Sequence, residues 1–338
     1  VGVIGLGFMG RTHLAAYRHA DAHSQPCRVV AVADRNTERL AGRASPAGNI
    51  ATEAEDQPAF DPKQTHACEE PQELLADPGV ELVSICTPTD SHVDLTIAAI
   101  ESGKHVLVEK PLAVRSCDAK RVADAARASD RIVMPAMCMR FWPAWAHAKR
   151  VIDSGEFGPV RSATFHRLGS MPAWGKSFYS DDARSGGALV DLHIHDADFV
   201  LHCFGRPDAV TSTGSPNHLT TLYSFYDGPA HIVAEGGWGH ASGFGFKMRY
   251  VIAFNRVTLD FDLARDPQLL LCDESAARPI ELPPTTGYDE QALAILAAVR
   301  SSKPAPVACD DAVAGLELLE AERESLRTGS TLRLERDS

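Results

Sequence analysis

Residues 1–20 read VGVIGLGFMGRTHLAAYRHA, and this stretch decides the fold. An apolar run from Val1 to Ile4 leads into Gly5-x-Gly7-x-x-Gly10, and a helical pattern follows. In a dinucleotide-binding βαβ unit, these glycines allow a tight turn, close approach of the backbone to the pyrophosphate, and contact between helix and strand. The N–H groups at the start of the helix then face the phosphates. The stretch therefore predicts a strand, a phosphate-binding loop and a helix.

A second apolar strand, RVVAVAD (residues 28–34), follows the helix and ends in Asp34. Asp34 lies 24 residues beyond Gly10, where a carboxylate is expected to accept hydrogen bonds from the adenosine ribose. Its charge would repel a 2′-phosphate, which favours NAD, whereas Arg35 could pair with such a phosphate and leaves NADP open. The predicted cofactor-binding residues of this region are Gly5, Gly7, Phe8, Met9, Gly10, Asp34 and Arg35.

Apolar strands and helical patterns then alternate up to residue 137, which is typical of an open parallel sheet. The predicted strands are residues 82–88, 104–111 and 131–137, and the predicted helices are 91–103 and 115–130. Ligands of such sheets bind beyond the carboxyl ends of the strands, where Thr87, Pro88 and the triplet at 109–111 stand. A polar stretch with three prolines at residues 45–66 predicts an irregular surface excursion around one short strand.

Beyond residue 137 the pattern changes. Residues 160–272 contain successive alternating segments separated by turns, which favours a largely antiparallel sheet. Two helical patterns, 289–302 and 310–327, complete the chain. We predict an α/β fold with an N-terminal Rossmann dinucleotide-binding domain, residues 1–136. A C-terminal α+β domain, residues 137–338, is expected to carry a large, mostly antiparallel open sheet for substrate binding and oligomerisation.

The segment GGALVDLHIHDADFVLHCFG (residues 186–205) carries two histidines that resemble a metal-binding His-x-His pair. Glycines at both ends punctuate a segment of helix length. On one helix from 188 to 203, Asp191 and His195 lie one turn apart and share a polar stripe with Asp198 and His202. His193 and His195 would then point to roughly opposite sides, because each residue turns by about 100°. We therefore predict no metal site, and a carboxylate that orients an imidazole.

Lys110 is the second candidate for chemistry. An ammonium at the end of a sheet strand, next to a dinucleotide, can stabilise an alkoxide or position a hydroxyl. From the residues alone, a solvated lysine at the rim of the sheet is an equal alternative.

These motifs together resemble those of the Gfo/Idh/MocA family of oxidoreductases. The matching stretches are VGVIGLGFMGRTHLAAY, CTPTDSH, GKHVLVEKPLA and GGALVDLHIHDADFVLHCFG, and in order and spacing they cover most of the chain. The resemblance implies that Lys110 lies near the nicotinamide ribose and the substrate, with a cis peptide bond before Pro111. It implies that Asp191 and His195 form a catalytic pair. It also adds Thr87, Pro88, His92, Glu109 and Lys110 to the cofactor-binding residues.

The chain departs from the family pattern at several points. Ala188 replaces the usual third glycine of the lead-in, and the excursion at 45–66 is longer. The roles of His193 and of Arg140 in the segment RFWPAW (residues 140–145) stay open. By resemblance the substrate is a sugar, inositol or related polyol, and the protein is a homodimer or homotetramer. Residues able to stack on or bond to a sugar, with packing as an equal alternative, are Arg140, Trp142, Arg167, Trp174, Tyr179, Asp181 and Arg184.

The sequence thus predicts reversible hydride transfer between a secondary hydroxyl and a nicotinamide. His195 would accept the hydroxyl proton, Asp191 would orient its ring, and Lys110 would stabilise the alkoxide. An NAD-dependent glycoside hydrolase on the same scaffold and a non-catalytic NAD(P)-binding regulator are the alternatives. A metal-dependent hydrolase using His193 and His195 is the weakest reading, because it needs a strand where the flanking glycines favour a helix.

Bulk composition narrows the classes of partner. The chain has 338 residues and a formal net charge of −12, which argues against binding to nucleic acid or to an anionic membrane surface. The chain contains no apolar run of 18 residues, which argues against a membrane-spanning helix. Eight cysteines are scattered without C-x-x-C, which favours free thiols and a cytoplasmic location. Because the chain begins at Val1 within an apolar strand, we expect a start methionine and a few residues to precede it.

Overall fold

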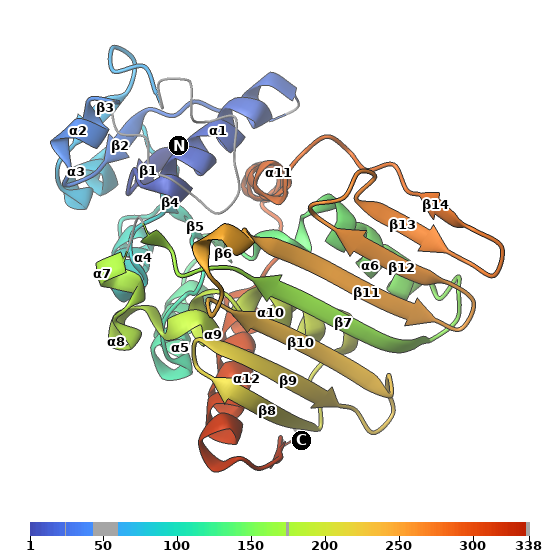
Figure 1. The fold of residues 1–338 in the computed structure, drawn as a ribbon. Helices are drawn as coiled ribbons and strands as arrows, with labels where there is room; N and C mark the ends of the chain where they lie inside the picture. The colour runs from blue at the N-terminus through green and yellow to red at the C-terminus, as the bar shows by residue number, and fades with distance from the viewer. Residues whose placement is uncertain (24, 43–59, 174–175, 336–338) are drawn as a thin grey trace. The chain divides into compact units, whose positions relative to one another are not determined.

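The computed structural model describes residues 1–23, 25–42, 60–173 and 176–335. Most of the excursion predicted at 45–66 lies outside the described residues, and its end enters strand β3 (His66–Cys68). The chain forms two compact units (Figure 1). Unit 1 contains Val1–Phe141 and Thr286–Ala314, and unit 2 contains Trp142–Thr285 and Gly315–Ser338. Within the described ranges, no helix is both long and apolar enough to cross a bilayer.

Unit 1 is built on a six-stranded parallel sheet in the order β3-β2-β1-β4-β5-β6. Helices cover both faces of such a sheet, so its strands can be apolar throughout, and every residue of β1 and β4 is buried. The predicted Rossmann arrangement is therefore confirmed. The other strands are β1 (Gly2–Ile4), β2 (Ala31–Ala33), β4 (Leu82–Ile85), β5 (His105–Val108) and β6 (Val133–Pro135).

The helices of unit 1 follow the predicted alternation with the strands. They are α1 (Phe8–His23), α2 (Thr37–Leu40), α3 (Pro71–Ala76), α4 (His92–Glu101), α5 (Ser116–Arg127) and α11 (Gly287–Ser301), with short 3₁₀ turns η2 (Thr89–Ser91) and η3 (Cys138–Arg140). A capping box starts α11, where Thr286 and Asp289 bond each other's backbone N–H groups. This box satisfies two N–H groups that a helix otherwise leaves open.

The division between the units differs from the continuous domains expected at 1–136 and 137–338. Helix α11, from the last fifth of the chain, packs against α1 in unit 1. Gln291 of α11 is buried, and its side-chain amide lies 3.4 Å from Nε2 of His13 on α1. The sequence pattern shows an amphipathic helix here but not its partner. Its apolar face packs within unit 1.

Unit 2 contains a nine-stranded sheet in the order β14-β13-β12-β11-β7-β10-β9-β8-β15. All pairs are antiparallel except β7 with β10, which confirms the predicted mostly antiparallel sheet. The strands are β7 (Val160–Leu168), β8 (Ala209–Ser215), β9 (His218–Ser224), β10 (His231–Gly237), β11 (Lys247–Phe254), β12 (Thr258–Asp262), β13 (Leu269–Cys272), β14 (Ala277–Pro279) and β15 (Leu332–Arg333).

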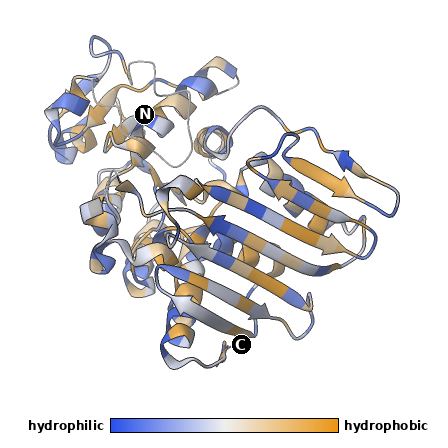
Figure 2. Cartoon of the chain, viewed as in Figure 1, coloured by the Kyte–Doolittle hydropathy of each residue, from blue (hydrophilic) through white to orange (hydrophobic). Residues whose placement is uncertain are grey.

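Helices lie on one face of this sheet, and the other face is open (Figure 1). They are α6 (Pro143–Ser154), α7 (Lys176–Tyr179), α8 (Asp182–Ser185), α9 (Gly187–Asp191), α10 (Ile194–Phe204) and α12 (Cys309–Thr328), with a 3₁₀ turn η5 (Ser242–Phe244); α12 begins in unit 1 and continues in unit 2. Residues along the central strands alternate between buried and partly exposed, and Figure 2 shows that hydrophobic and hydrophilic residues are interspersed along these strands. This alternation is expected where one face of a sheet meets helices and the other meets solvent.

The core of unit 2 is aromatic. Trp145 of α6 is fully buried, and its ring makes edge contacts with Tyr250 and Phe261 at centroid separations of 4.9 and 4.6 Å. A charge also lies within this core. Arg167 of β7 donates two hydrogen bonds, of 2.9 and 3.0 Å, to the carboxylate of Asp196. Both side chains are buried, and the paired geometry satisfies the charges that burial would otherwise penalise.

The helix predicted from 188 to 203 is interrupted, which corrects the sequence-based expectation. Helix α9 ends at Asp191 and α10 begins at Ile194. At the break the backbone N–H groups of Leu192 and His193 both donate to the carbonyl of Ala188, at 3.0 and 2.8 Å. One extra residue is thus inserted into the turn, as in a π-bulge. The predicted polar residues therefore do not form one stripe of equal exposure: Asp198 is buried, whereas Asp191 and His195 are half-buried.

The glycine-rich loop tests the fold most directly. A Cβ on Gly10 would lie 1.8 Å from the carbonyl oxygen of Gly5, whereas one on Gly315 would meet no atom within 4 Å. We expect Gly10→Ala to lower the free energy of unfolding by about 1–3 kcal/mol or more, because the loop must move. The control Gly315→Ala, within α12, should raise it by ~0.5–1 kcal/mol, because alanine favours a helix. Denaturant unfolding measures both, and equal effects would contradict this close contact.

Candidate active site

The loop after β1 has the geometry that a bound pyrophosphate requires. Gly5 has φ of +89°, and a Cβ there would lie 2.7 Å from the carbonyl oxygen of Cys86. Only glycine is comfortable in such a conformation with so little space. Phe8 and Met9 are half-buried. Because they begin α1, their N–H groups belong to the first turn of the helix, where N–H groups have no partner within the helix. Such a turn favours an anion.

Asp34 is fixed at the end of β2 beside this loop. Its Oδ2 accepts a 2.6 Å hydrogen bond from the backbone N–H of Leu6 and lies 3.4 Å from Nη1 of Arg39. Arg35, the predicted phosphate partner, is instead 83% exposed and lies 3.7 Å from Glu70. The arginine beside Asp34 is therefore Arg39 on α2, which the sequence reading missed. Its position five residues after Asp34 was the available signal.

The turn after β4 is held from inside by His92. One ring nitrogen lies 2.8 Å from the carbonyl of Pro111, and the other lies 2.8 Å from the carbonyl of Thr87. Burial lowers the pKa of His92. Thr87 also accepts a 2.7 Å bond from the hydroxyl of Ser91, and Pro88 accepts one of 2.8 Å through its carbonyl. His92 thus links the segments that follow two strands through backbone carbonyls, and its contact with the cofactor stays a prediction.

Glu109 likewise points into unit 1. It is 5% exposed, its Oε1 lies 2.9 Å from Nε2 of His13, and its Oε2 accepts a 3.1 Å bond from the backbone N–H of Lys110. The side chain of Glu109 therefore meets protein groups on both oxygens, and its role in cofactor binding stays a prediction. A carboxylate with both oxygens engaged inside the protein holds the backbone of Lys110 in place. The implied cis peptide bond between Lys110 and Pro111 is present.

The His13–Glu109 pair is part of a buried polar network on α1. Nδ1 of His13 lies 3.2 Å from the hydroxyl of Ser84, which in turn lies 2.7 Å from the hydroxyl of Tyr17. Burial alone would lower the pKa of His13, but its contacts with Cys86 and Glu109 raise it to about 10. The imidazole is therefore positively charged at neutral pH and forms an ion pair with Glu109 under the Lys110 loop. Removal of one member of such a pair leaves an unpaired buried charge.

Asp191, His193 and His195 surround the break between α9 and α10 in unit 2. Asp191 and His195 are half-buried. His193 is fully buried, and its Nε2 lies 3.1 Å from Oε2 of Glu322. His193 is thus directed toward Glu322 in the interior, whereas the side chain of His195 is half-buried. Within the described ranges, no group of three or more His, Cys, Asp or Glu side chains could hold a metal ion.

Most of the residues that were candidates for sugar contacts have contacts with other groups of the protein. Arg167 is committed to Asp196 in the core, and Arg140 forms a 2.9 Å ion pair with Asp311 in unit 1. Tyr179 packs edge-on against Trp238, with ring centroids 5.2 Å apart. Trp142 is 8% exposed. The guanidinium of Arg184 lies 5.4 Å from the ring centre of Phe178. Asp181 caps α8 by accepting a hydrogen bond from the N–H of Ala183. Trp174 lies outside the described residues.

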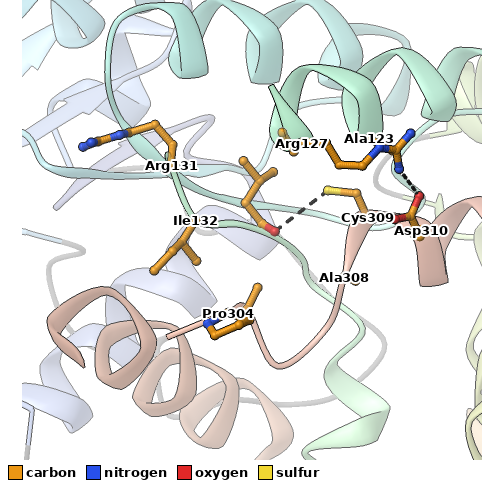
Figure 3. A pocket seen from close by; sticks show the side chains of 11 residues that line it. Ala123, Arg127, Arg131, Ile132, Pro304, Ala308, Cys309 and Asp310 are labelled. Carbon is orange, nitrogen blue, oxygen red and sulfur yellow. Dashed lines mark hydrogen bonds and ion pairs between the residues drawn. The ribbon is translucent and has the colours of Figure 1, made fainter. Parts of the chain in front are cut away.

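A separate pocket of about 280 Å³ lies on unit 1 at the start of β6 (Figure 3). Arg127 and Cys309 line it, but the Arg127 guanidinium bonds Asp310 and the thiol of Cys309 faces the carbonyl of Val133 at 3.9 Å. β6 is an edge strand, and the pocket adjoins its amino end. Ligands of parallel sheets bind at the opposite, carboxyl end. None of the predicted site residues lines this pocket.

The unit 1 residues fit a bound NAD. The space beside Gly5 and Gly10 is too small for any side chain, the first turn of α1 follows directly, and a fixed carboxylate stands at the end of β2. These three features match the needs of a pyrophosphate and an adenosine ribose. Gly5, Gly7 and the first N–H groups of α1 would hold the phosphates, and Asp34 would hold the ribose.

A Rossmann unit with this loop, joined to an open antiparallel sheet, defines a class of two-domain dinucleotide-binding proteins. The model of an oxidoreductase family with an NAD-binding Rossmann fold, GFO/IDH/MocA, matches residues 1–137. The C-terminal domain model of the same family matches residues 145–239. The chain belongs to the GFO/IDH/MocA family. The predicted family, fold class and NAD cofactor are thereby confirmed at the level of the family.

Individual relatives agree with this assignment. The chain is 40% identical over 139 residues to scyllo-inositol 2-dehydrogenase (NAD(+)) of Bacillus subtilis, a match covering 40% of this chain and 39% of that protein. It is 30% identical over 216 residues to levoglucosan dehydrogenase of Pseudarthrobacter phenanthrenivorans, covering 63% and 53%. A structure of levoglucosan dehydrogenase with NADH and levoglucosan superposes with a TM-score of 0.84 at 23% identity, covering 99% of both chains. At that identity the likeness shows the fold alone.

The His13–Glu109 pair predicts an unusual dependence of stability on pH. The pKa of His13 is raised from 6.5 to about 10 on folding. Its stabilising contribution is therefore complete below pH 6.5 and is lost as the pH rises toward 10. We expect His13→Gln to be less stable than the wild type at pH 6, by a difference that shrinks toward pH 10. Denaturant unfolding at several pH values measures that difference.

His92 provides a control of opposite sign. Folding lowers its pKa below 6.5, so its contribution is present above that pH and is lost as the pH falls. The stability difference between the wild type and His92→Gln should therefore shrink toward acid. Parallel pH profiles for the two variants would contradict the assignment of an ion pair to His13.

Proposed function

We propose that this protein is an NAD-dependent dehydrogenase that oxidises a secondary hydroxyl of a sugar, inositol or related polyol, or reduces the corresponding ketone. The observation that carries the proposal is the arrangement around Lys110. A buried ion pair fixes its backbone at the carboxyl end of β5, the edge of the sheet where a dinucleotide binds. When bound, NAD would accept or return the hydride.

The chain's own residues would hold and move the proton. His195 would accept the proton of the hydroxyl as hydride leaves the same carbon, and Asp191 would orient its ring. An imidazole suits this task because its unperturbed pKa of about 6.5 lies near neutral pH. The ammonium of Lys110 would stabilise the negative charge that develops on the oxygen. NADP is the alternative cofactor in this proposal, because Arg39 beside Asp34 would offer a cation to a 2′-phosphate.

The substrate class rests on the relatives. Scyllo-inositol 2-dehydrogenase, levoglucosan dehydrogenase and myo-inositol 2-dehydrogenase of Thermotoga maritima are each named for a polyhydroxylated ring. The last of these is 23% identical over 99% of this chain and 98% of its own. A compact ring with several hydroxyls is therefore the class of substrate to test first.

The test is turnover by two variants. Purified protein is mixed with NAD and a panel of inositols and anhydrosugars, and NADH absorbance is followed. We expect His195→Ala and Lys110→Ala each to lower kcat by about 10²–10⁴-fold, as the loss of a positioned acid–base group does. NADH binding, measured by fluorescence, should change little for His195→Ala. His66→Ala, at the exposed β3 of unit 1, serves as the unaffected control.

Two outcomes would contradict the proposal. Release of an aglycone from a chromogenic glycoside, with no net NADH, would indicate a hydrolase instead. Unchanged turnover in His195→Ala would remove this imidazole from the chemistry.

We also propose a homodimer or homotetramer formed through the open face of the unit 2 sheet. The strand registers align Val251 with Thr164, Thr164 with Val233, and Val233 with Leu222. This row crosses four strands on the open face, and Val251 and Leu222 are 36% and 37% exposed. Three of these four side chains are aliphatic, and an exposed row of this kind favours burial against a second copy.

Sedimentation tests the assembly. The wild type should sediment as a dimer or larger, and the double variant Val251→Lys with Leu222→Lys should sediment as a monomer. Tyr226→Lys is the matched control, because Tyr226 is 83% exposed but lies off the row. A wild type that is monomeric at micromolar concentration would overturn the proposal.

The compartment we propose is a reducing one, consistent with the cytoplasm. All eight cysteines are described and are free thiols, and half of them are buried. Free cysteines of this number are ordinary where thiols are kept reduced.

A further inference from the structure

The break between α9 and α10 is held by a side chain that the proposed chemistry does not use. Nε2 of His193 lies 3.1 Å from Oε2 of Glu322 on α12 and 3.2 Å from the hydroxyl of Tyr223 on β9. The Tyr223 hydroxyl itself donates to Oε1 of Glu322 at 2.8 Å. Because both neighbours of this ring nitrogen are oxygens that accept, the proton of the imidazole lies on Nε2.

Glu322 is the fixed end of this arrangement. It is fully buried, and besides His193 and Tyr223 it accepts a 3.0 Å bond from the hydroxyl of Thr221. That hydroxyl lies 2.8 Å from the hydroxyl of Ser212 on β8. A carboxylate with three donors is well satisfied and has little freedom to move. It therefore ties His193 to the sheet and to α12 at once.

His193 is held just as firmly from its other side. A Cβ on Gly236 of β10 would lie 2.6 Å from Nδ1 of the imidazole, so the ring packs directly on a strand that has no side chain there. The carbonyl of His193 accepts from the N–H groups of Asp196 and Ala197, which starts α10. Its own N–H donates to Ala188 in α9. The backbone of this one residue thus ends one helix and begins the next.

Charge strengthens the contact. Burial alone would lower the pKa of His193, but Glu322, followed by Asp196, raises it, while Arg167 acts in the opposite direction. Within this pair, the Glu322 carboxylate favours the protonated form of the imidazole, which burial alone would oppose. Removal of one member of such a pair is more disruptive than its net contribution to stability suggests.

We propose that His193 is the positioning residue of the site: its contact with Glu322 fixes the interruption between α9 and α10, and thereby the relative direction of Asp191 and His195. Asp191 closes α9, and His195 lies in the first turn of α10. A helix without the interruption would rotate one against the other by about 100° for each residue removed from the turn. This inference rests on the proposed dehydrogenase function, because it assumes that Asp191 and His195 act together.

Two variants test it in different ways. His193→Met removes the donor to Glu322, and Gly236→Ala pushes the ring away while leaving every polar group in place. His193→Gln keeps a donor near the position of Nε2 and serves as the conservative variant. Tyr250→Phe is the control, because it loses a single buried bond, from its hydroxyl to the carbonyl of Ala144 at 2.8 Å, elsewhere in the same unit.

We expect His193→Met and Gly236→Ala to lower kcat by about 10- to 100-fold, the effect of a small misplacement of catalytic groups, with KM and NADH affinity within about threefold of the wild type. His193→Gln should recover most of kcat, and Tyr250→Phe should keep it. In hydrogen exchange, peptides covering residues 187–200 should lose protection in the two disruptive variants but not in the control.

Each negative result contradicts a different part of the proposal. If the wild type oxidises no polyol, the proposed function fails, and the exchange measurement still decides whether His193 holds the turn. If the wild type is active and both disruptive variants keep its kcat, the positioning role is overturned. Unchanged protection of residues 187–200 overturns it as well, whatever the activity.

Discussion

The interior of each unit contains a buried carboxylate that contacts an imidazole. Glu109 lies 2.9 Å from His13 in unit 1, and Glu322 lies 3.1 Å from His193 in unit 2. Buried charges are tolerated only when they are paired and fully bonded. In each pair one member is close in sequence to a residue proposed for catalysis: Glu109 precedes Lys110, and His193 stands two residues before His195. Each of the two proposed catalytic residues is therefore supported from within its own unit, by charge as well as by packing.

Much of unit 1 could be predicted because its signals are local. The glycine pattern determines β1, its loop and the start of α1, and continuous apolar runs determine the buried parallel strands. Asp34 could be placed for the same reason, since it ends the strand that follows. The arginine beside it could not, because the approach of Arg39 depends on where α2 begins. Asn36 sets that start by capping Glu38 and Arg39 through its side chain.

What the sequence could not show is the direction in which a side chain points. Glu109 was placed at the end of a strand, and His92 was added by the family resemblance, yet both side chains face the interior, where His13 and two backbone carbonyls meet them. The interrupted helix has the same origin. Residues 188–203 have a helical pattern throughout, and the group that stabilises the interruption, Glu322, lies 129 positions beyond His193 in the chain. Such long-range partners leave no periodic trace.

The division of the chain also bears on its biosynthesis. Unit 1 begins with Val1 but is completed only by residues 286–314, where Gln291 of α11 covers the His13 network. During synthesis on the ribosome, the nucleotide-binding unit can therefore bury its charged centre completely only after most of the polypeptide has emerged. The order of synthesis therefore differs from the order in which the parts of unit 1 can pack together.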